Sequence, residues 1–364
     1  MKRDFLKRMT SVVMAGVMVM SLGACGGTIK STSSDASGEV VSADASASSD
    51  AVYKVGIVQY VDDASLNQIE ANIESELDAL GEELGVTFEY ADYTYNGQAD
   101  GSVLNQIAAE LLADEVDIIV PIATPTAQIM QAATEDEDIP IVFAAVSDPV
   151  GAGLVEDMDA PGGNITGTSD ALNTEAIIDL MVAADEDLDY VGLLYSKSES
   201  ASEQPIEDAK AYLDELGIAY VEKTGTTTDE VSTAADALIA EGVDAIFTPT
   251  DNTVMTAELS IYEKIAESGI AHYCGADSFA LNGAFLGYGV DYANLGVATA
   301  DMVADILVNG ADPATTAVQT FDNGIATVNT EICDILGWDM DTLTKAFSKS
   351  CSSVVETTTA EEFE

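Results

Sequence analysis

From residue 52 onward, the sequence alternates short apolar runs with longer stretches in which apolar residues recur every three or four positions. Residues 53–59 are apolar and β-branched, which predicts a strand; the stripe from Leu66 to Leu84 predicts a helix that ends at Gly85. Residues 116–122 are apolar almost without interruption, as in a strand that helices cover on both faces. This alternation predicts an α/β fold with a mostly parallel sheet.

The second part of the chain repeats this order of elements, starting with a strand predicted at residues 190–195. Residues 243–250 begin with Val-Asp, continue with apolar residues and end with Thr-Pro-Thr, and residues 116–126 carry a similar pattern. We therefore predict two α/β lobes. Ligands of open parallel sheets bind beyond the carboxyl ends of the strands, so two facing lobes place their loops around one cleft.

The charge of the chain limits what it can bind. Its 364 residues, enough for about two domains, include 12 Lys and Arg but 65 Asp and Glu, a formal net charge of −53. Nucleic acids and anionic lipid surfaces require a basic face, so we expect neither as a partner of the folded part. Both arginines, Arg3 and Arg8, lie near the N-terminus. A ligand carboxylate must therefore be held without an arginine.

The N-terminus resembles a secretion signal. Residues 1–8 are basic, and the apolar segment 9–22 is shorter than the roughly 20 residues that span a membrane. Leu-Gly-Ala-Cys at 22–25 resembles a bacterial lipobox, which implies removal of signal peptide 1–24 and lipidation of Cys25. An ordinary secretory signal with an incidental cysteine is the alternative.

The residues after Cys25 support an anchored protein. Residues 25–51 are rich in Ser, Gly and Ala, a composition typical of a flexible tether. We expect an extracytoplasmic protein that lipidated Cys25 anchors to the outer face of the bacterial cytoplasmic membrane.

The sequence shows no pattern typical of catalysis. His272 is the single histidine and lies in an apolar segment, and no nucleophile motif or phosphate-binding loop occurs at a strand–helix turn. Cys274, Cys333 and Cys351 have no metal-binding spacing. We expect thiols without a role, with a Cys333–Cys351 bridge as the alternative. The prediction is a protein that is not an enzyme and uses neither a metal nor a cofactor.

One predicted strand end offers a site for a carboxylate. Residues 124–126, Thr-Pro-Thr, open a predicted helix, where hydroxyl and free N–H groups meet the positive end of the helix dipole. Such a site needs no cation, which fits the missing arginines. An ordinary helix cap is the alternative, and it is compatible with a ligand role.

Other strand ends offer acceptors for an ammonium group. Asp148, Asp251 and Asp277 follow predicted strands, and each can pair with a ligand ammonium or cap a helix. Asp251 with Asn252 is preferred because it follows the second Thr-Pro-Thr. The predicted ligand-binding residues are Gln59, Thr124, Pro125, Thr126, Ala127, Gln128, Ser147, Asp148, Thr250, Asp251, Asn252 and Asp277.

Five longer motifs resemble the ABC-transporter substrate-binding lipoproteins of the tryptophan/tyrosine-binding type. They are Ile-Ala-Thr-Pro-Thr-Ala-Gln at 122–128, Phe-Ala-Ala-Val-Ser-Asp-Pro-Val-Gly-Ala-Gly-Leu-Val at 143–155, Pro-Gly-Gly-Asn-Ile-Thr-Gly-Thr-Ser-Asp at 161–170, Pro-Thr-Asp-Asn-Thr-Val at 249–254 and Gly-Tyr-Gly-Val-Asp-Tyr-Ala-Asn-Leu-Gly at 287–296. The resemblance implies the type I periplasmic-binding-protein fold, in which a multi-strand hinge joins two Rossmann-like lobes with parallel sheets around a ligand cleft. Members bind a small molecule, several of them an aromatic amino acid, and deliver it to a permease with a cytoplasmic ATPase.

The resemblance also implies how the chain is divided. The expected parts are lobe 1 at 52–166 and 291–320, lobe 2 at 167–290 and 321–345, and an acidic tail at 346–364. After the first strand, members commonly carry His-Pro-Ala-Leu-Asp, whereas residues 63–67 here read Asp-Ala-Ser-Leu-Asn. This departure changes the charge at one edge of the expected cleft.

The sequence therefore predicts a lipid-anchored receptor that captures an amino acid, in first place an aromatic one, for an ABC permease and its ATPase. Candidates for stacking on the ligand side chain are Tyr60, Tyr195 and Phe279. A receptor for another neutral small molecule, such as a nucleoside or a sugar, is one alternative. A ligand sensor that docks on a membrane receptor is another.

Overall fold

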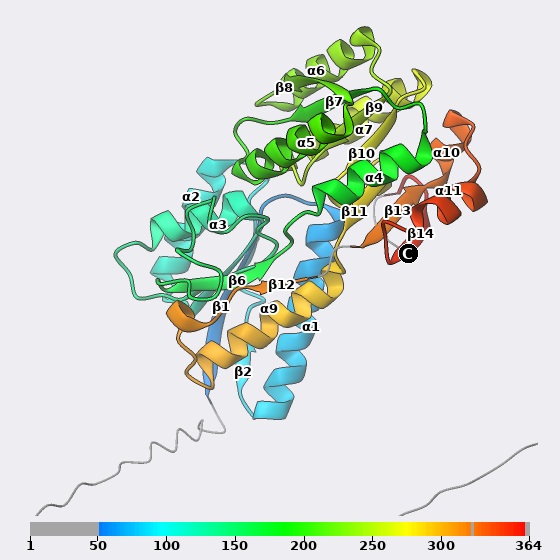
Figure 1. The fold of residues 1–364 in the computed structure, drawn as a ribbon. Coiled ribbons are helices and arrows are strands. Elements are labelled where there is room, and N and C mark those ends of the chain that lie inside the picture. Colours follow the sequence, from blue (N-terminus) through cyan, green and yellow to red (C-terminus); the bar gives the residue numbers. More distant parts are fainter. Residues whose placement is uncertain (1–50, 322–323, 361–364) are drawn as a thin grey trace, which may run out of the picture. The chain divides into compact units, whose positions relative to one another are not determined.

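The computed structural model describes residues 51–321 and 324–360, so the predicted signal peptide, Cys25 and the tether up to residue 50 lie outside it. The described residues belong to one compact unit and form two sheets (Figure 1). None of the helices within these residues has the length and apolar character needed to cross a membrane.

The first sheet contains seven strands within the described residues, and all their pairings are parallel. Its order is β12-β6-β5-β4-β1-β2, with β3 also paired to β1. The strands are β1 (Val52–Gln59), β2 (Thr87–Glu89), β3 (Thr94–Asn96), β4 (Ile118–Ile122), β5 (Ile141–Phe143), β6 (Ile165–Ser169) and β12 (Gln319–Thr320).

Helices cover both faces of this sheet and complete what we call the first lobe. They are α1 (Ala64–Leu84), α2 (Gly101–Ala113), α3 (Thr124–Ala133) and α9 (Tyr292–Leu307), with the short η2 (Pro313–Thr315). Ile118 and Val120 of β4 pack in one hydrophobic cluster with α1 and α9, whereas Ile119 packs in another with α2 and α3. Because successive side chains of a strand point to opposite faces, burial on both faces requires the uninterrupted apolar run seen in the sequence.

The second sheet also contains seven strands in the described part of the chain, in the order β14-β13-β11-β10-β9-β7-β8. β11 and β13 pair antiparallel, and the other neighbours pair parallel. The strands are β7 (Tyr190–Tyr195), β8 (Ala219–Thr224), β9 (Ala245–Thr248), β10 (Ala271–Cys274), β11 (Leu286–Gly289), β13 (Ile325–Asn329) and β14 (Ser353–Thr357).

The helices of the second lobe likewise lie on both faces of its sheet. They are α4 (Thr174–Ala184), η1 (Ser200–Ser202), α5 (Glu203–Leu216), α6 (Thr228–Glu241), α7 (Asn252–Glu267), α8 (Ser278–Leu281), α10 (Thr330–Leu336) and α11 (Met340–Phe347). Apolar residues of α4, α5, α10 and α11 form one cluster, and those of α6 and α7 belong to the cluster that also holds α1 and α9. The predicted fold class, two α/β lobes with mostly parallel sheets, is confirmed.

The described elements change lobe at three places along the chain. The first crossing lies between β6 of the first sheet and α4, which packs on the second sheet. The second lies between β11 of the second sheet and α9, which packs on the first sheet. The third lies between β12 of the first sheet and β13 of the second. The first sheet thus extends through β6 to Ser169, three residues past the predicted end of the first lobe segment at 166.

The segment expected to be an acidic tail contains a strand. Residues 353–357 form β14, which pairs parallel to β13 at the edge of the second sheet. The β-branched sequence Ser-Val-Val-Glu-Thr suits a strand, and Val354 packs against the core of the second lobe. Cys274, Cys333 and Cys351 are free thiols, so the alternative of a Cys333–Cys351 bridge is wrong.

Candidate ligand-binding site

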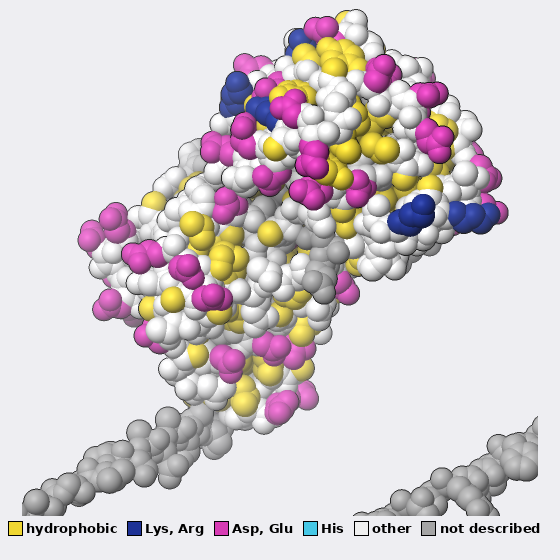
Figure 2. Space-filling model, viewed as in Figure 1, with side chains coloured by type: hydrophobic (Ala, Val, Ile, Leu, Met, Phe, Trp, Pro, Cys, Tyr) yellow, Lys and Arg dark blue, Asp and Glu magenta, His cyan; other side chains and the backbone are white. Residues whose placement is uncertain are grey.

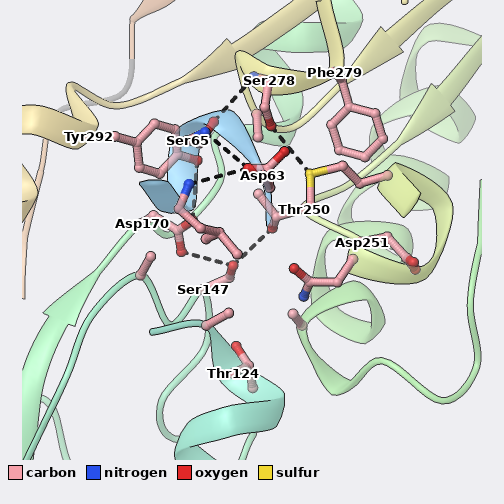
Figure 3. Close-up of a pocket in the computed structure, with 17 residues that line it drawn as sticks. Asp63, Ser65, Thr124, Ser147, Asp170, Thr250, Asp251, Ser278, Phe279 and Tyr292 are labelled. Carbon is pink, nitrogen blue, oxygen red and sulfur yellow. Dashed lines mark hydrogen bonds between the residues drawn. The ribbon is translucent and has the colours of Figure 1, made fainter. Parts of the chain in front are cut away.

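A small cavity of about 40 Å³ lies where strand ends of the two lobes meet (Figure 3). The lining residues come from both lobes and include carboxyl, hydroxyl and apolar side chains. They are Asp63, Ser65, Leu66, Ala123, Thr124, Ala145, Ser147, Asp170, Ala201, Thr250, Asp251, Asn252, Met255, Ala276, Ser278, Phe279 and Tyr292.

On the side of the first lobe, the cavity meets the start of α3. The residue before the helix is Ala123, so no side chain caps the helix N-terminus, and Pro125 occupies its first turn. The backbone of Ala123 has φ 77° and ψ 153°, a region that alanine adopts only under strain. Ala145, after β5, also has a positive φ of 52°. Two strained strand ends therefore face the cavity beside a helix terminus without a side-chain cap.

On the side of the second lobe, the cavity meets the start of α7, which is capped. Asp251 Oδ1 accepts a hydrogen bond from the Val254 N–H at 2.9 Å. Asp251 Oδ2 accepts two more, from the Ser196 N–H at 2.6 Å and from the Ser202 hydroxyl at 2.7 Å. Although Asp251 lines the cavity, both of its oxygens are used within the lobe.

Glu199 adds a second buried carboxyl group beside Asp251. It accepts hydrogen bonds of 3.3 Å from Asn252 Nδ2 and Thr253 Oγ1. Burial, followed by the charge of Asp251, raises the pKa of Glu199 well above its usual range. Burial also raises the pKa of Asp251. The start of α7 is therefore an acidic environment.

Direct hydrogen bonds join the two lobes around the cavity. Ser147 Oγ of the first lobe and Thr250 Oγ1 of the second lie 2.9 Å apart. Ser65 Oγ, in the first turn of α1, donates to Asp277 Oδ1 at 2.5 Å and accepts from the Ser278 N–H at 3.2 Å. The lobes are therefore in contact at two points, and the cleft is closed.

Two buried carboxyl groups, Asp63 and Asp170, and the half-buried Asp277 lie around the buried side chain of Tyr292. Asp170 accepts from Ser147 Oγ at 2.9 Å and from the Tyr292 hydroxyl at 3.3 Å. Burial raises the pKa of Asp170, raises that of Asp63 to about 6 and raises that of Asp277 to about 7. Burial and the charges of all three carboxyl groups raise the pKa of Tyr292 well above its usual value.

One oxygen in this cluster lacks a donor. Asp63 caps α1, with Oδ1 accepting from the Ser65 and Leu66 N–H groups at 3.0 and 3.2 Å. Asp63 Oδ2 is buried and accepts no hydrogen bond from the residues that the structure describes. An unpaired buried carboxylate oxygen is costly, so this position calls for a donor from a ligand or a proton.

The remaining wall is apolar. Phe279 and Met255 of the second lobe face the cavity together with Leu66 of the first, and the Ser278 hydroxyl donates to Met255 Sδ at 3.3 Å. Alanines complete this wall at several points. The arrangement combines polar groups at the strand ends with an apolar surface, as ligand pockets usually do.

Five of the residues predicted from the sequence line the cavity. They are Thr124, Ser147, Thr250, Asp251 and Asn252. Others lie nearby without lining it. Gln59 is buried and hydrogen-bonds to Asn67 and Asn96. Asp148 accepts from the Gly151 N–H within its own loop.

The other predicted residues of α3 point elsewhere. Pro125, Thr126 and Ala127 are in the helix but do not line the cavity, and the Thr126 hydroxyl is buried without a partner among the described residues. Gln128 Nε2 donates to the Ala152 carbonyl at 3.0 Å. Asp277 lies behind Ser65 rather than in the lining.

Several lining residues were not among the predicted binding residues. Asp170 ends one of the motifs that carry the resemblance, and Tyr292 lies inside another, so these motifs were the signal that pointed to them. Asp63 and Ser65 lie where the sequence departs from the family pattern. The sequence places that stretch at one edge of the expected cleft, but its pattern does not identify either residue as ligand-binding.

His272, the single histidine, lies in the core of the second lobe. Its Nε2 is 2.8 Å from Thr248 Oγ1, and its Nδ1 is 3.0 Å from Glu258 Oε1. Both His272 and Glu258 are buried away from the cavity. No group of three or more metal-ligating side chains is found among the described residues.

Acidic side chains are spread over the face of the molecule shown in Figure 2, where basic ones appear only on the second lobe. The salt bridges within the described residues involve Lys210, Lys223, Lys264 and His272, and none includes Asp63, Asp170 or Asp277. The carboxyl groups around the cavity therefore have no basic side chain to neutralise them.

Comparisons with known proteins agree with this geometry. The sequence profile of the family described as ABC transporter substrate binding protein matches residues 54–348. A curated relative, the "Tyrosine-binding protein" of Clostridioides difficile (strain R20291), is 30% identical over 318 residues, which cover 86% of this chain and 89% of the relative.

Solved structures are similar over most of the chain. An ABC domain from Streptococcus pneumoniae in complex with L-Trp is 31% identical, with a TM-score of 0.76, covering 84% of this chain and 100% of that one. A ligand-free, open substrate-binding protein from Clostridium difficile is 29% identical, with a TM-score of 0.63. The match covers 85% of this chain and 100% of that one.

Proposed function

The chain belongs to the ABC transporter substrate-binding proteins and has the type I periplasmic-binding-protein fold, and we propose that it captures an aromatic amino acid between its lobes. One observation carries this proposal. A helix N-terminus without a side-chain cap and an unpartnered carboxylate oxygen face the same cavity, as an amino acid with its two opposite charges requires.

The ligand carboxylate binds at the start of α3. The first N–H groups of a helix have no partner within the helix, and no side chain at Ala123 supplies one. The Thr124 hydroxyl lies in the cavity lining beside them. These groups and the helix dipole hold an anion without an arginine, in agreement with the absence of arginine after Arg8.

The ligand ammonium binds against Asp63, with Asp170 nearby. Among the described residues Asp63 Oδ2 has no donor, whereas the oxygens of Asp251 accept three hydrogen bonds from the second lobe. Asp251, the first choice from the sequence, is therefore better suited to hold the start of α7. The apolar wall with Phe279 and Met255 faces the ligand side chain.

Ligand entry requires the lobes to separate. Pockets that hold drug-sized ligands measure roughly 300–1,000 Å³, several times the cavity seen here. Separation breaks the contacts of Ser147 with Thr250 and of Ser65 with Asp277. The closed arrangement then re-forms around the ligand if the ligand binds it more tightly than the open one.

We place the protein outside the cytoplasmic membrane, anchored through Cys25 and working with an ABC permease and its ATPase. The lipobox-like residues 22–25, the basic and apolar residues before them and the family membership support this assignment. Mass spectrometry of the protein isolated from its host tests the anchor. A mature N-terminus at a diacylated Cys25 is the expected result, and an unmodified Cys25 contradicts it.

A thermal-shift screen tests the ligand class. We expect L-tyrosine or L-tryptophan to raise the melting temperature, and we expect adenosine and glucose to leave it unchanged. The size of the rise depends on the ratio of ligand concentration to Kd. A shift with adenosine or glucose but with no amino acid contradicts the proposal and favours the nucleoside or sugar receptor.

A further inference from the structure

One serine of the first lobe contacts two carboxyl groups that belong to opposite lobes. The Ser65 N–H donates to Asp63 Oδ1 at 3.0 Å, and its hydroxyl donates to Asp277 Oδ1 at 2.5 Å. Asp63 follows β1 and Asp277 follows β10. Closure of the lobes therefore brings two carboxyl groups together that are far apart in the sequence.

The described elements packed around this pair supply further acids, and none of them supplies a basic side chain that forms an ion pair with it. Asp170 comes from the connection after β6, Tyr292 from α9, and Asp251 from the start of α7. No salt bridge reaches Asp63, Asp170 or Asp277 within the described residues. The hydrogen bonds from Ser65, Ser147 and Tyr292 are from neutral groups, so they leave the charge uncompensated.

Closing the empty cleft at neutral pH thus has an electrostatic cost. Burial of a carboxylate away from water disfavours its charged form, and a second carboxylate nearby disfavours it further. The pKa of Asp277 rises to about 7, through burial first and then the charge of Asp63, and burial raises the pKa of Asp63 to about 6. In the open form, where water reaches these groups, ordinary values are expected.

We propose that Asp63 and Asp277 determine specificity by allowing the lobes to close only when the ligand brings a positive charge or when protons take its place. This inference rests on the proposed function, because it assigns the charge to the ligand ammonium. A ligand with the same ring and carboxylate but no amine fits the cavity yet leaves the two acids uncompensated. It therefore binds weakly and fails to hold the lobes closed.

The pH dependence has a definite sign. Because the closed form raises the pKa of both acids above their open-form values, low pH favours the closed form. The preference for the closed form is fully present when the pH is below the ordinary pKa of an aspartic acid. It is lost as the pH rises through the closed-form pKa values of about 6 for Asp63 and about 7 for Asp277. The empty protein is therefore expected to close near pH 5 and to open near pH 8.

Small-angle scattering of the protein, with and without ligand, tests the inference. At pH 8 we expect L-tyrosine to reduce the radius of gyration and 3-(4-hydroxyphenyl)propionate, its deaminated analogue, to leave it unchanged. At pH 5 the empty protein should reach the radius of the tyrosine complex. Calorimetry at pH 8 should show at least 100-fold weaker binding of the analogue.

Two variants distinguish the effect of the acids on lobe closure from the contact of Asp63 with the ligand ammonium. Asp277→Asn keeps Asp63 for the ammonium, so it should compact the empty protein at pH 8 and strengthen binding of the analogue about tenfold. The double variant Asp63→Asn/Asp277→Asn should make the radius of the empty protein independent of pH. The control Asp92→Asn/Asp159→Asn removes two exposed charges and should behave as the wild type does.

Each contrary result has a distinct meaning. If the empty protein has the same radius at pH 5 and pH 8, or if the analogue compacts it as tyrosine does, the inference is wrong even though amino acids bind. If no amino acid binds while the radius still falls with pH, the proposed function is wrong, and closure by protons at the two acids is supported.

Discussion

The two identical Thr-Pro-Thr sequences accompany helix starts of different kinds. Thr124–Thr126 lies inside the first turn of α3, after an alanine that supplies no cap. Thr248–Thr250 lies before α7, which begins after the capping residue Asp251. The first half thus leaves its helix N-terminus open to the cavity, whereas the second half closes its own with a carboxylate.

This difference indicates how a duplicated architecture forms an asymmetric site. A helix N-terminus attracts an anion, and it can take that anion from its own chain or from a ligand. At α7 the chain supplies Asp251, and Glu199 adds a second acid next to it. At α3 the chain supplies neither, and in the proposed function the ligand carboxylate takes this place. Variants at the two helix starts test this contrast.

Asp251→Ala is expected to lower the free energy of unfolding by about 3 kcal/mol. It removes the cap of α7 and leaves the Ser196 N–H and the Ser202 hydroxyl buried without an acceptor. Urea denaturation measures the effect, and Asp229→Ala, an exposed change in the first turn of α6, serves as the control. A loss below about 1 kcal/mol contradicts a structural role for Asp251.

The acids at α7 should make stability depend on pH. Burial, followed by the charge of Asp251, raises the pKa of Glu199 to about 8 in the folded protein. The stability that protonated Glu199 contributes is fully present below the pKa of a glutamic acid in the unfolded chain, near 4.3. It is lost as the pH rises through the folded-state pKa of about 8. Between pH 5 and pH 8, the free energy of unfolding of wild type should therefore fall by about 3 kcal/mol more than that of Glu199→Gln.

Urea denaturation at both pH values checks this expectation. Glu203→Gln, an exposed change at the start of α5, should retain the wild-type pH dependence. If the free energy of unfolding changes equally between pH 5 and pH 8 in wild type and in Glu199→Gln, Glu199 is not the titrating group.

Thr124→Val should weaken L-tyrosine binding about tenfold, or about 1.4 kcal/mol, because it removes a hydroxyl donor beside the open end of α3. Thr126→Val is the matched comparison, since its hydroxyl is buried without a partner and does not line the cavity. Calorimetry should show unchanged affinity for Thr126→Val. Similar losses for both variants would place Thr126 in the site, as the sequence alone suggested.

Ala123→Gly should raise the free energy of unfolding by about 1 kcal/mol, the smallest effect in this series. Glycine adopts the backbone angles of Ala123 without strain, and the gain exceeds the entropy that glycine adds to the unfolded chain. Ala127→Gly, inside α3, should be destabilising by about 1 kcal/mol. Loss of stability in Ala123→Gly contradicts strain at this position.

The architecture could be predicted from the sequence because it depends on local patterns. The apolar run at residues 116–122 is buried on both faces of the first sheet, and the stripe from Leu66 to Leu84 falls within α1. Gly85 and Gly217 end helices with positive φ angles of 70° and 74°. Each of these features follows from residues close together in the chain.

The cavity lining could be predicted only in part. Strand ends such as Thr124, Ser147 and Thr250 were found because parallel sheets gather their carboxyl ends on one edge. Asp170 and Tyr292 were missed as binding residues, although they lie in recognisable motifs. Nothing local distinguishes an aspartate that faces a cavity from one that caps a helix.

The two α/β halves, the acidic composition and the lack of arginine after Arg8 can be read from the sequence without a structure. Three features emerge only from the folded chain: Asp251 is used within its lobe, the start of α3 has no side-chain cap, and Ser65 links Asp63 to Asp277. Helix and strand patterns arise from neighbours a few positions apart, whereas the Ser65–Asp277 contact spans 212 residues. Such a contact depends on how two lobes close, which no local pattern of residues encodes.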